Sequence, residues 1–276
     1  MPLKLMYITN KPEVAEIAEA TGVDRIFIDM EYIGKEDRQA GLDCVKSHHT
    51  VEDVEKIRKV ITKSEVLVRV NPIHDATDEY SSSVEEINAV IEAGADIIML
   101  PMYKTISEVY RFLNCVNGRT KTLLLAETPE ACTIMKEVAS LPGVDEIHIG
   151  LNDLHLALKR KFMFELLADG TVESICADIK DKPYGFGGIA RVGYGILPAE
   201  FVIREHYRLG STGAILSRSF CNADRIQNTY EIRKLFETEV VRIRQNEKLA
   251  NKMSDVEFEE NRQAVINKVA EIVAGM

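Results

Sequence analysis

Short apolar runs alternate with amphipathic stretches from one end of the chain to the other. Each run is about as long as a β-strand, and most are apolar at nearly every position. This pattern is typical of strands that are buried on both faces of a parallel sheet. The eight runs occupy residues 3–9, 25–30, 66–70, 97–101, 122–126, 146–149, 187–190 and 213–216.

The stretches between these runs carry helical spacing and helix boundary signals. Pro12 lies in a first turn, Thr50 is followed three residues later by Asp53, and Gly94 and Gly210 stand where helices should stop. The helices are predicted over residues 12–21, 50–61, 83–93, 105–116, 129–140 and 198–209. Eight strands alternating with helices predict an α/β fold, a closed (β/α)8 TIM barrel. An open doubly wound sheet is the alternative, but no GxGxxG motif follows the first strand.

The composition changes beyond Phe220. Residues 222–252 predict a long charged helix, and residues 256–273 predict a second one after a break at Ser254. We therefore divide the chain into a barrel over residues 1–220 and extra C-terminal helices over residues 221–276. This extension either packs on its own barrel or is exchanged with a neighbouring subunit.

The charge and the cysteines narrow the classes of partner and compartment. The formal net charge of −10 disfavours binding to nucleic acid or to an anionic membrane surface. No apolar run approaches the length of a membrane span, and the first residues lack a signal-peptide pattern. The five cysteines are widely spaced and form no CxxC pair, which favours a reducing, cytoplasmic environment.

Polar side chains collect where the predicted strands end, which is where such barrels carry their active sites. Glu127 and Asp153 follow consecutive strands, so their carboxylates should converge. Two oxygen ligands suit Mg²⁺ or Mn²⁺, with positions left for water and for a chelating 2-keto acid. Structural caps or ion pairs are the alternative roles of these two residues.

Arginines also stand at strand ends. The forked guanidinium of Arg69 suits an enolate oxygen or a carboxylate, although an ion pair with Asp29 or Glu31 is equally consistent with the pattern. Arg191 and Arg218 are weaker candidates, for structure or for a distal part of the substrate.

Five segments in this order resemble the HpcH/HpaI aldolase and citrate lyase β-subunit family. Each lies at a predicted strand end, and together they run over residues 27 to 154. They read FIDME at 27–31, VRVNP at 68–72, GADIIMLPM at 94–102, LLAET at 124–128 and VDEIHIGLNDL at 144–154.

The resemblance implies a phosphoenolpyruvate/pyruvate-type barrel with a metal ion on Glu127 and Asp153. It implies that Arg69 contacts the oxo group of the substrate, and that the chains form homo-oligomers, often trimers or hexamers. We expect Glu31, Asn152 and Arg191 to join Arg69 in binding the substrate.

The sequence departs from the aldolase pattern at one position. The aldolases have a histidine base directly after the Asp-x-Glu motif, where this chain has Tyr32. A tyrosine with an ordinary pKa near 10 is a poor base at neutral pH. His48 and His49 follow the same strand, and either is a candidate base, with helix capping or packing as their alternative roles.

These residues predict a metal-dependent carbon–carbon lyase or aldolase. It would act on a small 2-keto acid or an acyl derivative, including acyl-CoA, through a metal-stabilised enolate. The same barrel could instead serve condensation, thioester hydrolysis or phosphoenolpyruvate chemistry. A non-catalytic oligomeric scaffold is a further alternative, because a fold alone does not fix a function.

Overall fold

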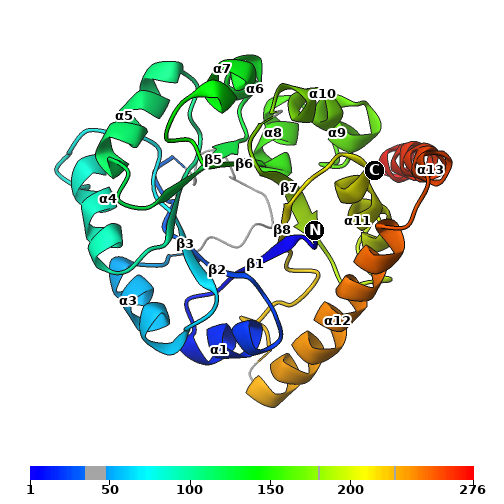
Figure 1. Cartoon of the computed structure of the whole chain (residues 1–276), viewed down its shortest axis with the longest axis horizontal. Coiled ribbons are helices and arrows are strands. Elements are labelled where there is room, and N and C mark those ends of the chain that lie inside the picture. Colours follow the sequence, from blue (N-terminus) through cyan, green and yellow to red (C-terminus); the bar gives the residue numbers. More distant parts are fainter. Residues whose placement is uncertain (35–47, 180, 227) are drawn as a thin grey trace.

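Eight parallel strands close into a barrel in the computed structural model, which describes residues 1–34, 48–179, 181–226 and 228–276. The first strand, β1, pairs with both β2 and β8, so the sheet has no edge (Figure 1). The predicted TIM barrel is therefore confirmed, and the open sheet is excluded. The strands are β1 Lys4–Ile8, β2 Arg25–Asp29, β3 Glu65–Arg69, β4 Ile97–Leu100, β5 Lys121–Ala126, β6 Glu146–Ile149, β7 Tyr184–Ile189 and β8 Gly213–Leu216.

Helices surround the barrel, and local boundary signals fix several of their first residues. Ser82 and Glu85 form a reciprocal capping box at the start of α4, as Ser254 and Glu257 do at the start of α13. The described helices are α1 Pro12–Ala20, α3 Val51–Val60, α4 Ser83–Glu92, α5 Ile106–Val116, α6 Pro129–Thr133, α7 Met135–Ser140, α8 Leu151–Ala157, α9 Glu165–Ala168, α10 Thr171–Asp178, α11 Ala199–Arg208, α12 Thr229–Ala250 and α13 Asp255–Ala274.

The helices differ from the sequence prediction in three places. The predicted helix over residues 129–140 is broken at Ile134 into α6 and α7. Three short helices, α8 to α10, fill the connection between β6 and β7, where each has too few turns for a clear periodic pattern. The long helix predicted from residue 222 begins only at Thr229, where the Asn228 side chain accepts a hydrogen bond from the backbone N–H of Tyr230. The prediction of helix from 222 is therefore wrong: residues 222–226 form turns and irregular structure, and residues 222–224 line the cavity described below.

The interior of the barrel is apolar at mid-height and charged at its lower end. Seven side chains pack inside the ring: Met6, Phe27, Leu67, Ile97, Met99, Leu123 and Leu125. Arg25 lies at the start of β2 and is almost fully buried, with ion pairs to Glu65 at 2.9 Å and to Glu146 at 2.6 Å. These layers fill the barrel from below and leave its other end, where the strands finish, for the cavity.

The two C-terminal helices pack on the barrel helices of the same chain. Helix α12 lies against α1 and α11, and α13 lies against α9 and α11 (Figure 1). The buried Glu247 of α12 accepts a hydrogen bond from the backbone N–H of Leu3 at 2.6 Å, which ties this helix to the first strand. The boundary at residue 220 and an exchange of these helices between subunits remain predictions.

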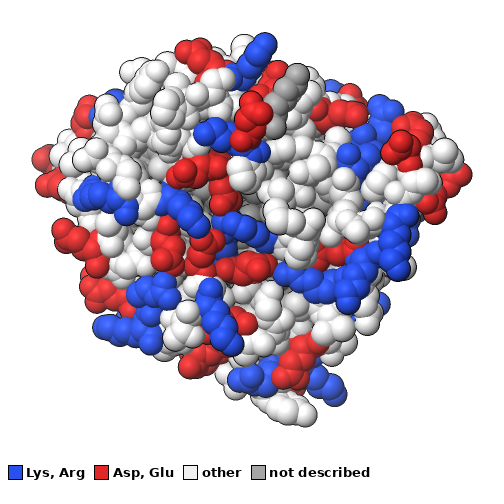
Figure 2. All heavy atoms as spheres, viewed as in Figure 1, with Lys and Arg blue, Asp and Glu red and all other residues white. Residues whose placement is uncertain are grey.

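The surface is mixed in charge. On the face drawn in Figure 2, the Lys and Arg side chains are interspersed with Asp and Glu side chains. None of the described helices combines the length and the apolar composition needed to cross a membrane.

Candidate active site

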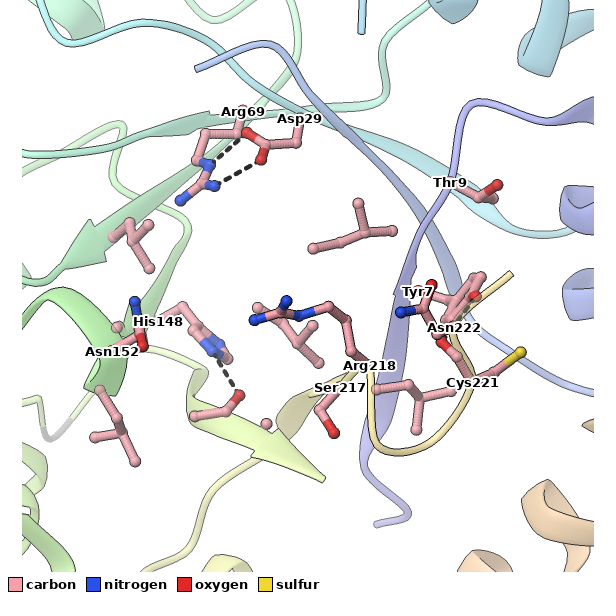
Figure 3. A pocket seen from close by; sticks show the side chains of 18 of the residues that line it. Tyr7, Thr9, Asp29, Arg69, His148, Asn152, Ser217, Arg218, Cys221 and Asn222 are labelled. Carbon is pink, nitrogen blue, oxygen red and sulfur yellow. Dashed lines mark hydrogen bonds and ion pairs between the residues drawn. The ribbon is translucent and has the colours of Figure 1, made fainter. Parts of the chain in front are cut away.

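A cavity of about 320 Å³ opens where the strands end. Polar side chains reach it from several strands and from the segments that follow them (Figure 3). Among the described residues that line it are Asp29, Arg69, Glu127, His148, Asn152 and Asp153. This position in the barrel is where enzymes of this fold bind their substrates.

Arg69 is held at the end of β3 by two carboxylates. Its Nε and Nη2 atoms donate to the two oxygens of Asp29, both at 2.8 Å, and its Nη1 lies 3.2 Å from an oxygen of Glu31. Burial disfavours the charge of Arg69, but these carboxylates outweigh it and raise the pKa of the guanidinium well above its ordinary value. The ion pairs considered from the sequence are therefore present, and they fix the guanidinium at the cavity wall.

Glu127 directly follows β5 and its side chain is buried. Burial, together with the nearby carboxylates of Glu31 and Asp153, raises the pKa of Glu127 well above its ordinary value, although Arg69 opposes this. One oxygen of Glu127 accepts a hydrogen bond from the backbone N–H of Met102 at 3.2 Å. Glu127 is thus kept in an environment that an additional positive charge would stabilise.

Gly150 provides the space that Glu127 occupies. A Cβ atom at residue 150 would lie 2.8 Å from Cβ of Glu127 and 2.9 Å from its Oε2. The next strand can therefore end beside Glu127 only because residue 150 is a glycine. The chain then turns into α8, whose first turn carries Asn152 and Asp153 to the cavity.

The donor set fits a divalent cation. Asp29 and Glu31 face the single charge of Arg69, whereas Glu127 and Asp153 add two further carboxylates at the same cavity. Within the described residues, no group of three or more His, Cys, Asp and Glu side chains is arranged around one point as metal ligands. Two carboxylates would leave the remaining positions of a Mg²⁺ or Mn²⁺ ion to water and substrate oxygens.

The predicted histidines differ in their positions. His49 lines the cavity, and its Nδ1 accepts a hydrogen bond from the backbone N–H of Asp29 at 3.0 Å. His48 is exposed and is not among the described residues that line the cavity. Tyr32 is 37% exposed and packs beside Tyr80, and burial followed by the charge of Glu86 raises the pKa of its hydroxyl. The deprotonated form of Tyr32 that could act as a base is therefore even scarcer at neutral pH than in an ordinary tyrosine.

The remaining substrate-binding candidates are divided between the cavity and its surroundings. Asn152 lines the cavity, and the buried Glu31 reaches the site through Arg69. The structure does not bring Arg191 into the described cavity wall: its guanidinium stacks 4.2 Å from the ring centre of Tyr194, and its Nε donates to the Ser219 carbonyl at 3.3 Å. A contact of Arg191 with the substrate remains a prediction.

Sequence reasoning missed several residues that line the cavity, and two contributions among them bear on the chemistry. His148 was noted only as part of a motif, yet it faces the cavity from β6 between the inward positions 146 and 150. The alternation of inward and outward side chains along β6 was the signal that could have identified His148 as a residue of the cavity. The other is the part of the cavity wall formed by residues 222–224 after β8. No sequence signal separated these residues from the helix that follows, because the two segments are alike in composition.

A closed parallel barrel with a charged cavity at the carboxyl ends of its strands is the architecture of a (β/α)8-barrel enzyme. The family model described as HpcH/HpaI aldolase/citrate lyase matches residues 4–165, which is more than half of the chain. The chain belongs to this family, as the five segments predicted, and the family indicates an enzyme of the lyase type.

Solved structures share the fold at low sequence identity. An HpcH/HpaI aldolase/citrate lyase family protein from Burkholderia cenocepacia J2315 has a TM-score of 0.61 and 17% identity, covering 84% of this chain and 95% of its own. The citrate lyase β subunit from M. tuberculosis, complexed with oxaloacetate and magnesium, has a TM-score of 0.55 and 14% identity, covering 85% and 97%.

Tryptophan synthase from M. tuberculosis, in an aminoacrylate-bound form, has a similar TM-score of 0.57 at 14% identity, covering 88% of this chain and 94% of its own. These likenesses therefore describe the fold alone. No protein of curated function matches the chain.

Proposed function

We propose that this protein is a Mg²⁺- or Mn²⁺-dependent carbon–carbon lyase or aldolase that acts on a 2-keto acid or an acyl derivative. The observation that carries the proposal is the shared cavity of Glu127, Asp153 and Arg69, in which two carboxylates lie beside a clamped guanidinium. The family model supports the reaction class. The magnesium and oxaloacetate in the related citrate lyase β subunit are consistent with the proposed ligands.

The proposed roles follow from the charge of each group. Glu127 and Asp153 would hold the metal ion, which would polarise the keto oxygen of the substrate and stabilise the enolate that forms when the carbon–carbon bond breaks. Arg69 would donate hydrogen bonds to the substrate's keto oxygen or carboxylate, because Asp29 and Glu31 fix its orientation. Asn152 would add an uncharged amide at the same wall of the cavity.

Condensation would use the same groups in reverse, because both directions share the enolate. Thioester hydrolysis and phosphoenolpyruvate chemistry would keep the barrel and the metal but need other substrates. We further propose that the chain forms homo-oligomers, trimers or hexamers, and that α13 contributes to their contacts. A scaffold without catalysis would keep its assembly after the carboxylates are removed.

Calorimetric titration with Mn²⁺ tests the metal site. Glu127→Gln and Asp153→Asn should each abolish measurable binding, because each removes an anionic ligand. Glu130→Gln is the matched control, since Glu130 is three residues from Glu127 but is exposed on α6 beside Lys104. Wild-type affinity in either site variant would refute the assignment of that ligand.

Two reactions of small keto acids test the chemistry. The wild-type protein with Mn²⁺ should decarboxylate oxaloacetate and should exchange the methyl protons of pyruvate for solvent deuterium, since both pass through an enolate. Glu127→Gln should lose both reactions. A wild-type protein that binds Mn²⁺ but performs neither reaction would contradict a keto acid lyase, and a screen of acyl-CoA substrates would then test the hydrolytic alternative.

A further inference from the structure

The proposed reaction needs a group that removes a proton from the substrate, and Tyr32 is a poor choice for it. Of the two histidines predicted from the sequence, only His49 lines the described cavity. Its Nδ1 accepts the backbone N–H of Asp29, so in the neutral ring the proton resides on Nε2. In this state His49 presents an N–H donor rather than a proton acceptor.

His148 is a second imidazole in the cavity, and glycines make room for it. It extends from β6 over the neighbouring β7, where Gly185 is its partner in register. A Cβ atom at residue 185 would lie 2.8 Å from Nδ1 of His148 and 2.2 Å from the carbonyl oxygen of Gly213. Gly187 and Gly188, further along β7, also line the cavity. A polar ring thus occupies the level at which the other inward side chains are apolar.

The hydrogen bonding of His148 defines which nitrogen carries its proton. Its Nε2 lies 3.3 Å from the carbonyl oxygen of Gly187, which can only accept a hydrogen bond. The neutral ring therefore carries its proton on Nε2, and the lone pair lies on Nδ1. Within the described part of the chain, Nδ1 makes no hydrogen bond of its own.

The surroundings keep this imidazole neutral. Burial lowers the pKa of His148 to about 4, the hydrogen bond to the Gly187 carbonyl opposes this, and Arg25 lowers the pKa further. Glu146 raises it and Arg69 lowers it, and the neighbouring His206 on α11 is itself uncharged at neutral pH because burial lowers its pKa to about 3. At physiological pH the ring is thus neutral, so Nδ1 keeps the lone pair that a base needs, and the lowered pKa favours release of the proton afterwards.

We propose that Nδ1 of His148 accepts the proton that the reaction removes from the substrate, a role that rests on the proposed lyase function. In the cleavage direction, the substrate hydroxyl loses its proton to Nδ1 and its oxygen forms the carbonyl of one product. The carbon–carbon bond breaks, and its electron pair stays on the second fragment as an enolate. The imidazolium then returns the proton to the enolate carbon, which restores neutral His148 and completes the keto acid product.

Two reactions test this role, because one of them needs a base and the other does not. Exchange of the pyruvate methyl protons needs a base, whereas decarboxylation of oxaloacetate generates the enolate by loss of CO₂ and needs none. His148→Gln should slow the exchange by at least about 100-fold, the usual contribution of a general base, and keep the decarboxylation close to the wild-type rate. The retained decarboxylation also shows that the variant is folded and loaded with Mn²⁺. His74→Gln is the matched control, because His74 bonds within the β3–α4 loop and does not line the cavity.

Each other result contradicts the inference in a distinct way. Equal loss of both reactions in His148→Gln would mean that His148 only supports the cavity. Exchange lost in His49→Gln but kept in His148→Gln would assign the proton to His49. A wild-type protein without either reaction would overturn the proposed function itself, and this role with it.

A readout independent of activity uses the metal-free protein. The ¹⁵N imidazole resonances should show His148 as the neutral tautomer with its proton on Nε2 at pH 7. A protonated ring or an Nδ1–H tautomer would overturn the inference.

Discussion

Gly150 is the position where one added methyl group should disturb the proposed metal site most directly. The backbone φ of this residue is −83°, so an alanine is not strained by the backbone conformation. The effect of Gly150→Ala is therefore steric. The new Cβ would lie 2.8 Å from Cβ of Glu127, 2.9 Å from its Oε2 and 3.2 Å from Cδ1 of Leu125.

The magnitude follows from what must move. Favourable carbon–carbon contacts lie at about 3.5–4.0 Å, so Cβ of Glu127 would have to retreat by roughly 0.7 Å or more. This atom is bonded directly to the backbone at the end of β5 and cannot swing aside as the tip of a side chain does. We expect Gly150→Ala to lower the free energy of unfolding by about 1–3 kcal/mol, as overpacking does. We expect Mn²⁺ to bind about 10- to 100-fold more weakly, the range found when groups that orient metal ligands are changed.

Urea unfolding and Mn²⁺ titration measure the two effects. Gly213→Ala is the matched control. Gly213 lies in the barrel strand β8, and its Cβ would meet Cε of Met6 at 3.5 Å and the Lys4 carbonyl at 3.6 Å, which are ordinary contacts. A folded Gly150→Ala protein that binds Mn²⁺ with wild-type affinity would refute the reasoning, since Glu127 would then not be the ligand that Gly150 admits.

Three further predictions concern the guanidinium, a buried histidine and the last helix. Arg69→Lys should lower turnover on the order of 100-fold, because an ammonium cannot bond both oxygens of Asp29 and also reach Glu31. An unchanged rate in steady-state kinetics would exclude a role for the forked guanidinium donors. Burial lowers the pKa of His206 to about 3, so below pH 6.5 the unfolded chain binds more protons than the folded chain, and stability should fall as the pH is lowered from 6.5 towards 3. At pH 5 this loss of unfolding free energy is about 2 kcal/mol. Urea unfolding at pH 7 and pH 5 should therefore show a loss that is smaller by this amount in His206→Gln than in the wild type. Equal losses in the two proteins would contradict the lowered pKa of His206. Removal of residues 254–276 deletes α13 and leaves Glu205 without Asn261, its partner at 2.8 Å, so the thermal midpoint should fall; light scattering that finds an unchanged oligomer would exclude α13 from the subunit contacts.

The charged groups at the strand ends illustrate how far sequence reasoning reached. The positions of Glu127 and Asp153 after consecutive strands predicted that both reach one cavity, and both line it. The pattern at Arg69 left open whether it pairs with Asp29 or with Glu31, and the structure has both contacts. That outcome depends on the register of β2 against β3, which sets Asp29 directly opposite Arg69.

The histidines show the limit of such reasoning. His48 and His49 are adjacent in the chain, yet only His49 lines the described cavity. His148 was not predicted as a site residue, because an isolated histidine within an apolar strand is also what a structural core residue looks like. Its exposure to the cavity depends on glycines in β7, which is a different strand and lies more than thirty residues away.

The amino-acid sequence by itself determined the elements and the end of the barrel that carries the chemistry. Apolar runs, helical spacing and capping residues act within a few positions of the chain, so they can be recognised in the sequence without knowledge of the fold. The tertiary structure alone decided the partners of Arg69, the space that the His148 ring occupies and the cavity wall at residues 222–224. These depend on the stagger of strands and on which side chains meet across the barrel, and both are set by packing between residues that are distant in sequence.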